Sequence, residues 1–372
     1  MSKILYVATS DIHLDVFHKP YLKWLSDQGH QVDVAVENRG ARELPGVHTY
    51  HYLAFPRDLI KKELLSSFLE LRRLLNRENY DLVHCHTPIP SMLTRLASRH
   101  LRKKGLKVLY TAHGFHFYKG APLSRWLIYY PAEWLLSRMT DGIVTINAID
   151  YFYVKEGMKI TQAHYINGIG VDSDRFKVFD QNTKKKIKKE LGYNDDEFIL
   201  LYVAEFIPRK NHKFLLQGTA ELVDKIPNLK LILAGTGILM EKMKKLAEDL
   251  AIKENVDFLG FRDDVHLLSG IADIGVSTSK HEGLGLGLAE MMMCGVPIVA
   301  TEDRGHKEMV VTGKNGFLFE QGDEESFIKY IMKLYKDEKL RQKISSNAKL
   351  SSGKFDIENS LKYMIEVYNE YL

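Results

Sequence analysis

Short apolar segments alternate with helical segments along almost the whole chain, and this order restricts the possible fold more than any other feature. In the first half, the predicted strands are Ile4–Ala8, Val32–Val36, Leu82–His86, Val108–Ala112 and Ile143–Ile146. In the second half, they are Phe198–Ala204, Leu229–Ala234, Val256–Leu259, Ile274–Thr278, Ile298–Thr301 and Phe317–Phe319. Continuous apolar runs separated by helices are typical of strands buried on both faces, so we expect an α/β fold with two parallel, doubly wound sheets of Rossmann type.

The length of the chain supports this division, because 372 residues are too many for one ordinary hydrophobic core. The segment Asn167–Gly170 separates the two series, and a hinge is expected near residues 167–175. We therefore predict an N-terminal domain of residues 1–168 and a C-terminal domain of residues 169–355. The net charge is only +4, which argues against a nucleic-acid partner.

Cysteine usage and the start of the chain bear on the compartment. Cys85 and Cys294 lie inside predicted regular elements and form no CxxC pattern, so neither a disulfide framework nor a zinc site is expected from them. The apolar run within Met1–Ala8 is too short for a signal-peptide core or a membrane span, and we interpret it as a buried first strand. A reducing cytoplasm is the expected compartment.

The stretch Ser279–Pro297 carries the clearest chemical signal. Gly283, Gly285 and Gly287 stand at alternate positions between an apolar strand and a run of helix formers, and Glu282 and Glu290 flank them. Such a turn favours anions, because a ligand can approach the backbone and the first N–H groups of the helix carry positive partial charge. Two acids beside an anion site suit a diphosphate flanked by hydroxyl groups, as in a nucleotide sugar. The alternative is a turn that only packs the helix against the strand.

The spacing from Glu282 to Glu290, followed by the strand segment CGVPIVAT, resembles the signature of retaining GT-B glycosyltransferases of family four. The resemblance covers essentially the whole chain. Its FHKPYLKWL and TAHGFHFYKGAP segments are similar to those of bacterial enzymes of capsular and exopolysaccharide assembly. It implies a GT-B fold, with two Rossmann-like domains facing each other across a cleft and the last helix, residues 356–372, returning to the N-terminal domain.

The resemblance also implies an activity of the hexosyltransferase type, EC 2.4. A hexose or N-acetylhexosamine would move, with retained configuration and without a metal or other cofactor, from a nucleotide-diphosphate sugar. The expected donor is a UDP-sugar, and the expected acceptor is a saccharide linked to a lipid diphosphate, used in capsule, exopolysaccharide or related surface-glycan assembly. Consistent with this, no DxD-type metal motif is present, and Asp263-Asp264 is interpreted as a helix cap.

Specific residues are implied for the donor side. Lys210 matches the family lysine that holds the diphosphate and stabilises the departing nucleotide, while Glu282 would hold the sugar hydroxyls and Glu290 the ribose hydroxyls. Many members carry an arginine five residues before the lysine, where this chain has Glu205, so Arg209 is the candidate substitute. Without the resemblance, Arg209 and Lys210 would be read as two surface cations. The remaining donor-side candidates are turn and loop positions: Gly235, Thr236, Phe261, Arg262, Gly283, Leu284 and Gly285. Gly235 and Thr236 could equally form a tight packing turn.

The N-terminal half supplies the other candidates. His113 resembles the family histidine that faces the donor sugar and is assigned a catalytic role, and Ser10, His13, His86 and His116 are acceptor-side candidates. Ser10 and His13 belong to the segment Thr9–His13, which is expected to be a loop after the first strand. His84 and His86 share one face of a strand, but no nearby spacing supplies further metal ligands. Packing or acceptor contact is therefore preferred to zinc at this position.

Aromatic and basic segments leave a membrane question open. The aromatics between Phe115 and Trp134 form either an acceptor platform, a membrane-facing surface or helix core. Basic stretches could attach the protein peripherally to the inner leaflet of the membrane, or they could be solvated helix faces. They are Lys61-Lys62, Arg72-Arg73, Arg99–Lys104 and residues 184–190.

Three other functions remain open at this point. The chain could be a nucleotide-sugar epimerase, since fold alone does not determine the reaction. It could be a non-catalytic nucleotide-sugar-binding subunit, with Glu205 marking a lost phosphate clamp. Glu282 and Glu290 could also act as a hydrolase pair, although a helical Glu290 suits ribose binding better than attack on an anomeric carbon.

Overall fold

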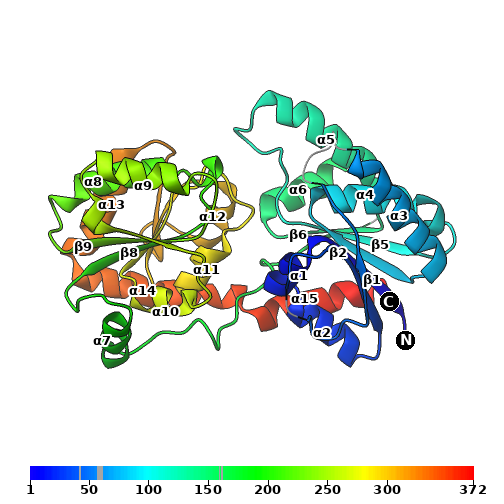
Figure 1. Ribbon diagram of the computed structural model, residues 1–372, viewed down its shortest axis with the longest axis horizontal. Coiled ribbons are helices and arrows are strands. Elements are labelled where there is room, and N and C mark those ends of the chain that lie inside the picture. Colours follow the sequence, from blue (N-terminus) through cyan, green and yellow to red (C-terminus); the bar gives the residue numbers. More distant parts are fainter. Residues whose placement is uncertain (42, 57–61, 159, 161) are drawn as a thin grey trace. The chain divides into compact units, whose positions relative to one another are not determined.

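The computed structural model describes residues 1–41, 43–56, 62–158, 160 and 162–372. The chain folds into two α/β units. The first unit combines Met1–Gly170 with the C-terminal segment Ile357–Leu372, and the second unit is the continuous segment Val171–Asp356 (Figure 1). The first unit thus ends at Gly170 rather than at residue 168, and the returning segment begins at Ile357 rather than at residue 356.

Within the described residues, the first unit contains a seven-stranded sheet in the order β3-β2-β1-β4-β5-β6-β7, and each neighbouring pair is parallel. The strands are β1 (Lys3–Ser10), β2 (Gln31–Glu37), β3 (Thr49–Tyr52), β4 (Leu82–His86), β5 (Lys107–Ala112), β6 (Gly142–Thr145) and β7 (Gln162–Tyr165). The helices are α1 (Asp11–Phe17), α2 (Lys19–Asp27), α3 (Glu63–Glu78), α4 (Pro88–Arg102), α5 (Leu123–Ser137), α6 (Ala148–Gly157) and α15 (Ile357–Asn369).

Two features of this sheet differ from the sequence-based expectation. The strands β3 and β7 were not expected, because both lie at the edges of the sheet, are only partly buried and lack a continuous apolar run. The segment Thr9–His13, expected to be a loop, ends β1 and begins α1. Ser10 is the N-cap of that helix, since its hydroxyl accepts a hydrogen bond from the His13 N–H at 3.4 Å.

The C-terminal helix α15 packs into the first unit, as expected. Tyr368 is fully buried, and its hydroxyl hydrogen bonds to the hydroxyl of Tyr6 and to Nδ1 of His84, 2.9 Å away. Tyr371 reaches Nε2 of His164 at 2.7 Å. Strands from the start of the chain and a helix from its end therefore share one polar network inside the first unit.

The second unit has a sheet whose described strands run in the order β10-β9-β8-β11-β12-β13, again with parallel pairs. The strands are β8 (Phe198–Val203), β9 (Leu229–Ala234), β10 (Val256–Gly260), β11 (Ile274–Ser277), β12 (Ile298–Thr301) and β13 (Gly316–Phe319). The α-helices are α7 (Gln181–Glu190), α8 (His212–Val223), α9 (Met240–Asp249), α10 (Val265–Ile271), α11 (Leu286–Met293), α12 (Arg304–Met309), α13 (Glu324–Lys336) and α14 (Glu338–Ser352). Short 3-10 turns are η1 (Pro208–Lys210), η2 (Lys253–Asn255) and η3 (Gly353–Phe355).

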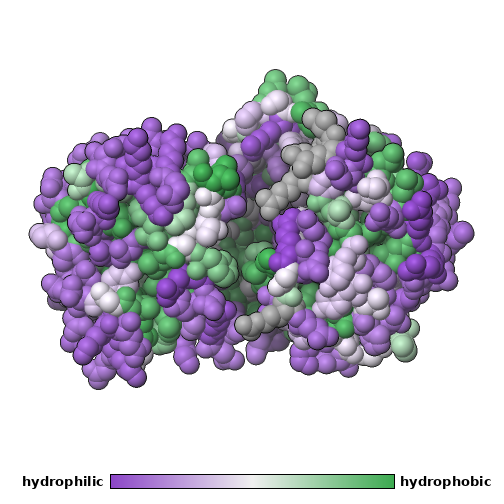
Figure 2. Space-filling view, in the orientation of Figure 1, coloured by the Kyte–Doolittle hydropathy of each residue, from purple (hydrophilic) through white to green (hydrophobic). Residues whose placement is uncertain are grey.

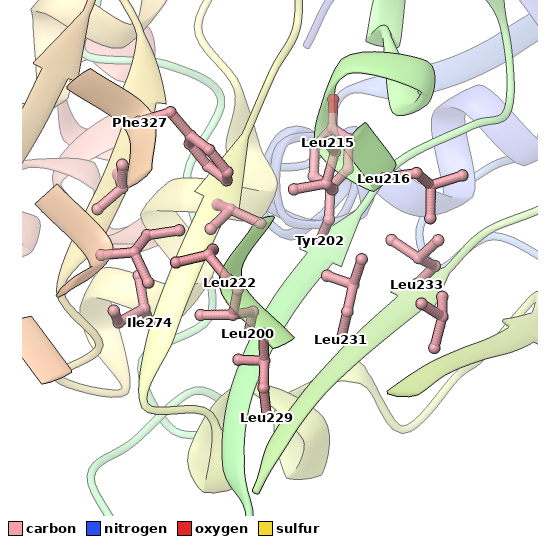
Figure 3. Close-up of a cluster of buried hydrophobic side chains, with 14 of the residues drawn as sticks. Leu200, Tyr202, Leu215, Leu216, Leu222, Leu229, Leu231, Leu233, Ile274 and Phe327 are labelled. Atoms are coloured by element: carbon pink, nitrogen blue, oxygen red, sulfur yellow. The ribbon is translucent and has the colours of Figure 1, made fainter. Parts of the chain in front are cut away.

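Helices cover both faces of this sheet, and the core lies between them and the strands (Figure 1). Figure 3 shows the side chains of one such layer, where Leu200 and Tyr202 from β8 meet leucines of α8 and Phe327 of α13. Burial of these apolar side chains is the main stabilising contribution to the unit. The two cysteines, Cys85 and Cys294, are free and buried, in agreement with the expected absence of a disulfide framework.

The basic helix α7 is mostly a solvated face, as one of the two interpretations expected, with Lys185, Lys186 and Lys189 exposed. Lys188 is the exception. It is buried, and its ammonium group donates to the carbonyl oxygens of Asp195 and Glu197 at 3.2 and 2.8 Å. These bonds tie α7 to the loop that precedes β8.

The strand order fixes where a ligand can bind in each unit. In the first unit the chain order reverses between β1 and β4, and in the second it reverses between β8 and β11. Loops that follow such a pair leave in opposite directions and open a crevice at the carboxyl ends of the strands. Candidate residues on these loops are considered next.

Candidate active site

The loops that follow β8 and β11 bring together the central donor-side candidates. Lys210 is the last residue of η1, the short turn that follows β8, and Glu282 lies in the loop between β11 and α11. Because β8 and β11 are neighbouring parallel strands, both loops emerge at the same edge of the sheet. This edge is the point of reversal in the second unit.

Glu282 binds both predicted cations. Its two carboxylate oxygens accept hydrogen bonds from Nζ of Lys210 at 2.6 Å and from Nη1 of Arg209 at 2.7 Å. Arg209 also donates to the carbonyl oxygen of His281 at 2.9 Å. The three charged groups, expected separately from the sequence, form one compact cluster.

The charge state of Glu282 follows from these contacts. Burial on its own would raise the pKa of this carboxyl group, but the positive charges of Lys210 and Arg209 outweigh it and lower the pKa to about 2. Glu282 is therefore an ionised acceptor of hydrogen bonds throughout the physiological pH range. It has no proton to give and both of its oxygens are already engaged.

Backbone contacts hold the η1 turn in place. The carbonyl oxygen of Lys210 accepts hydrogen bonds from the hydroxyl of Tyr202 at 2.9 Å and from that of Thr278 at 3.1 Å. The N–H of Lys280 donates to the carbonyl oxygen of Arg209 at 2.8 Å. Asn211 ends the turn in the left-handed conformation, with φ of +53°. The two loops are thus joined by hydrogen bonds, and the position of Lys210 is fixed by the strand β8 below it.

A third loop, after β12, supports Glu282 from the other side and was not anticipated from the sequence. The carboxylate of Asp303 accepts from the Glu282 N–H and, at 2.7 Å, from the N–H of His306, where it caps α12. Nε of Arg304 donates to the carbonyl oxygen of Glu282 at 3.2 Å. A Cβ on Gly305 would come within 3.0 Å of the Glu282 Cβ. The available signal was the position of Asp303, directly after the strand that pairs with β11.

The glycine-rich turn leads into α11 as expected. Gly285 is the N-cap, with a φ of +99° that suits glycine. Leu284 lies between the two glycines with its side chain buried, so this residue can offer a ligand only its backbone. The packing alternative therefore describes the Leu284 side chain. The backbone of the turn lies at the start of α11, where a ligand could contact it.

Glu290 is the fifth of the eight residues of α11. Burial raises the pKa of its carboxyl group to about 7, and the positive charge of Arg175 opposes this only in part. The described residues provide no hydrogen bond to the Glu290 carboxylate. The two acids of the motif are therefore in opposite states: Glu282 is paired and ionised, and Glu290 is unpaired and half protonated near neutral pH.

The remaining donor-side candidates lie on the loops after β9 and β10. Thr236 is exposed, whereas Gly235 is required by close packing, because a Cβ there would be 2.1 Å from the carbonyl oxygen of Ala204. Phe261 is 81% exposed. Arg262 binds the carboxylate of Asp264 at 2.7 Å. Asp264 does occupy the N-cap position of α10, but it makes no capping hydrogen bond, since its carboxylate is held by Arg262.

In the first unit, four of the five candidates converge and one does not. The rings of His13, His86 and His113 lie within 6.4 Å of one another, and Ser10 caps the helix that carries His13. His86 has no exposed surface, which fits packing better than contact with an acceptor. His116 lies apart and stacks on Tyr129, with ring centroids 4.7 Å apart. Sequence spacing missed a further member of the cluster, His18, which lies between α1 and α2, five residues after His13.

Comparison with known sequences agrees with this architecture. The family described as glycosyl transferases group 1 matches residues 183–351, and the family described as glycosyl transferase 4-like matches residues 3–147. EpsD of Bacillus subtilis (strain 168), whose name assigns it provisionally as a glycosyltransferase, is 39% identical over 372 residues, which cover 100% of this chain and 97% of EpsD.

Two further comparisons extend to named substrates and to the fold. The Escherichia coli UDP-Gal:alpha-D-GlcNAc-diphosphoundecaprenol alpha-1,3-galactosyltransferase is 28% identical over 297 residues, covering 77% of this chain and 74% of that enzyme. The structure of HepE from Anabaena, in complex with UDP and glucose, superposes with a TM-score of 0.82 at 21% identity, covering 99% of this chain and 100% of HepE. With the paired Lys210 and Glu282 at the strand reversal and full-length similarity to EpsD, the chain belongs to the GT-B glycosyltransferases of family four.

Proposed function

We propose that this glycosyltransferase moves a hexose or N-acetylhexosamine, with retention of configuration, from a UDP-sugar to a saccharide acceptor. The observation that carries the proposal is the cluster in which Lys210 and Arg209 share Glu282 beside the glycine turn. It supplies two cations for a diphosphate and one ionised carboxylate for sugar hydroxyls at one edge of the sheet. The UDP-Gal named for the E. coli relative and the UDP complex of HepE support a uridine nucleotide as the carrier of the sugar.

The ion pairs suggest how the donor enters. Without a ligand, Lys210 and Arg209 neutralise the buried charge of Glu282. A diphosphate offers the two cations an alternative set of oxygen acceptors, and it would leave the Glu282 carboxylate available for hydroxyl groups of the sugar. Since the negative charge on the diphosphate grows as the glycosidic bond breaks, cations fixed at this place would stabilise the transition state more than the ground state.

The proposed reaction needs no enzyme nucleophile. The oxygen of the acceptor hydroxyl attacks the anomeric carbon from the same face as the one from which the leaving group departs. The bond between the anomeric carbon and the phosphate oxygen breaks, and the departing diphosphate takes the proton of the acceptor hydroxyl. Without a donor, both oxygens of Glu282 are held by cations, and with the donor bound they would accept hydrogen bonds from the sugar hydroxyls, which argues against a hydrolase pair. His113 would face the donor sugar, and Glu290 would accept hydrogen bonds from the ribose hydroxyls.

Arg209 is the proposed replacement for the arginine that many relatives carry five residues before the lysine. Glu205, which stands at that position, is exposed and forms no ion pair with a residue that the structure describes. Arg209 is adjacent to Lys210 and binds the other oxygen of the same carboxylate. The two cations Arg209 and Lys210 are therefore present together, although the arginine of the usual position is replaced by Glu205. Their presence favours an active enzyme over a non-catalytic binding subunit. We propose that they neutralise the diphosphate without a divalent metal.

The epimerase alternative differs from transfer in where the sugar ends. An epimerase would change the configuration of the sugar while leaving it on the nucleotide, whereas a transferase releases UDP only when an acceptor is supplied. Incubation with a radiolabelled UDP-sugar and an extract of lipid-linked saccharides separates the two. Label that remains on the nucleotide as an epimer would refute transfer.

The acceptor is proposed to be a saccharide on a lipid diphosphate, as in the name of the E. coli relative, in the assembly of capsule, exopolysaccharide or a related surface glycan. None of the helices in the described part of the chain is both long enough and apolar enough to cross a bilayer. Helix α5 instead exposes an apolar side, visible as the hydrophobic surface at the top of Figure 2. Its exposed members are Leu123, Leu127, Ile128 and Leu135.

The opposite side of α5 is part of the core, because Trp126 and Tyr130 pack against Phe117. Trp126 and Tyr130 were thus core, as one interpretation held, while the aliphatic residues Leu127 and Ile128 between them are exposed. Exposed cations of the same unit would complement an anionic bilayer: Lys62, Arg72, Arg73, Arg99, Lys103 and Lys104. Arg102 is instead bound to Asp141, and Lys61 lies outside the described residues. We propose peripheral attachment of a cytoplasmic enzyme through α5.

The first prediction concerns the donor. In a thermal-shift screen of UDP, GDP, ADP and their sugars, uridine compounds should raise the melting temperature, because a ligand at 100 times its Kd stabilises the folded state by about 2.7 kcal/mol. The shift should persist in excess chelator. Stabilisation by guanosine or adenosine compounds alone, or a uridine shift abolished by chelator, would contradict the proposed donor site.

The second prediction concerns Lys210. Lys210→Ala should lower kcat by about 100-fold or more, the typical effect of removing one charge-stabilising contact from a transition state, while donor KM changes little. Lys213→Ala is the matched control, since this lysine is exposed on the adjoining first turn of α8. If the Lys210→Ala enzyme had the same kcat as the control, Lys210 would not be the residue that stabilises the leaving group.

The third prediction uses the raised pKa of Glu290. The ionised carboxylate is lost as the pH falls through about 7, so affinity for a UDP-sugar should decline from pH 8 to pH 6. Glu290→Gln should bind about tenfold more weakly at pH 8, in line with a lost hydrogen bond to a charged group, and its affinity should no longer follow this titration. Calorimetry at several pH values measures both effects. Equal affinities of the two proteins at pH 8 would remove Glu290 from the ribose site.

The fourth prediction concerns the membrane. The protein should sediment with anionic liposomes at low salt, and less so as salt screens the charges. A Leu127→Ser, Ile128→Ser double variant should sediment less, whereas Ile238→Ser, which alters an equally exposed side chain of the second unit, should not. No sedimentation of the unaltered protein would refute attachment, and equal loss in the control would refute the role of α5.

A further inference from the structure

Five described histidines gather at the carboxyl edge of the first sheet: His13, His18, His84, His86 and His113. They come from the first turns of α1, the junction of α1 and α2, the end of β4 and the residue after β5. Neighbouring ring centroids are 4.1 to 5.6 Å apart. These positions flank the reversal between β1 and β4, the place where a doubly wound sheet binds ligands.

The hydrogen bonding of these rings is uneven. His84 is fully satisfied, since Nδ1 bonds to the Tyr368 hydroxyl at 2.9 Å and Nε2 to the Thr111 hydroxyl at 2.8 Å. In contrast, the Nε2 atoms of His13, His18 and His86 are buried without a hydrogen-bond partner among the described residues. Buried polar atoms are rarely left in this state in a native protein. Three of them in one cluster indicate that something else binds there.

The geometry of three of the rings fits a metal ion. His13, His18 and His113 each offer one ring nitrogen, and these nitrogens all lie within 4.8 Å of one another. The ring centroids form a nearly equilateral triangle with sides of 5.3, 5.1 and 5.5 Å. An ion bound tetrahedrally at 2.0–2.1 Å from each nitrogen would place the centroids about 5 Å apart. Ring rotation, without movement of the strands, would therefore close the site.

The chemistry of the donors points the same way. A neutral imidazole ring offers one nitrogen with a free electron pair, and this is the form that binds a metal. Imidazole ligands suit zinc, copper, nickel and iron rather than magnesium or calcium.

We propose that His13, His18 and His113 form a binding site for a divalent transition metal, with zinc as the expected ion. Three protein ligands leave one coordination position for water or a hydroxyl oxygen. The ion would join the start of α1 to the segment after β5. His86 supports His113 from the buried side, with His86 Nδ1 and His113 Nε2 3.4 Å apart.

This site is separate from the proposed diphosphate clamp, which belongs to the second unit and is built from Lys210, Arg209 and Glu282. The metal would have no part in holding the phosphates. His113 is also the residue proposed to face the donor sugar, so turnover would not isolate the metal site. Its test is therefore read from metal binding alone, with no nucleotide present, and its failure would leave the donor proposal unaffected.

The test uses the full chain, purified without a polyhistidine tag and dialysed against chelator. Titration with zinc chloride should show one ion per chain and a raised melting temperature. Cobalt(II) should give the intense visible absorption of a four- or five-coordinate site. His13→Gln and His113→Gln should each weaken zinc binding more than about 100-fold, whereas His48→Gln, at an exposed histidine of the same unit, should match the unaltered protein.

Two results would overturn the inference. One is that the unaltered protein binds zinc no more tightly than the His13→Gln, His113→Gln double variant does. The other is an equal loss in the His48→Gln control, which would indicate adventitious binding by surface histidines. If the variants fail to fold, the cobalt spectrum of the unaltered protein decides, because a weak six-coordinate spectrum excludes the three-histidine site.

Discussion

A parallel sheet ends all its strands at one edge, and this constraint determines where the chemistry of the chain can lie. In the second unit, β8 and β11 are adjacent, so the loops that follow them begin side by side. Lys210 and Glu282 therefore meet, although more than seventy residues separate them along the chain. In the first unit, β1 and β4 do the same for His13 and His86. Side chains in the core stabilise the sheets, and the segments at these two reversals carry the ion-paired Glu282 and the histidines His13 and His86, whose Nε2 atoms have no hydrogen-bond partner among the described residues.

Charge compensation in the second unit is local and unequal. Glu282 is buried beside two cations and stays ionised. The pKa of Glu290, which lies in the following helix α11, is raised to about 7, because only Arg175 opposes the effect of burial. The same residue type in one motif thus performs different electrostatic tasks. Asp303, from the next strand along the sheet, holds the Glu282 backbone and makes the difference possible by fixing the carboxylate beside the cations. Under the proposed function, a donor diphosphate would replace Glu282 as the partner of these two cations.

Sequence patterns predicted the buried strands well and the edge strands poorly, for a physical reason. β4 and β9 are apolar along their length because helices cover both of their faces, whereas β3 and β7 are half exposed and carry no such run. The candidates Glu282 and Glu290 were proposed from their spacing, and Lys210 from its match to the family lysine. Their mutual contacts, the support from Asp303 and the histidine cluster were not, because these depend on side-chain direction and on segments distant in the chain. The Ser10 loop was misjudged because its hydroxyl begins a helix.

The return of α15 has a consequence for synthesis on the ribosome. The polar network of the first unit is complete only when Tyr368 reaches His84 and Tyr6, and roughly 200 residues are translated between Gly170 and the end of the chain. At typical bacterial elongation rates this takes about 10 to 40 s. During that interval the first unit has emerged without its last helix, while the second unit, being one continuous segment, can fold completely. The first unit is therefore completed only after the whole second unit has been translated, and until then Tyr6 and His84 lack their contact with Tyr368 of α15.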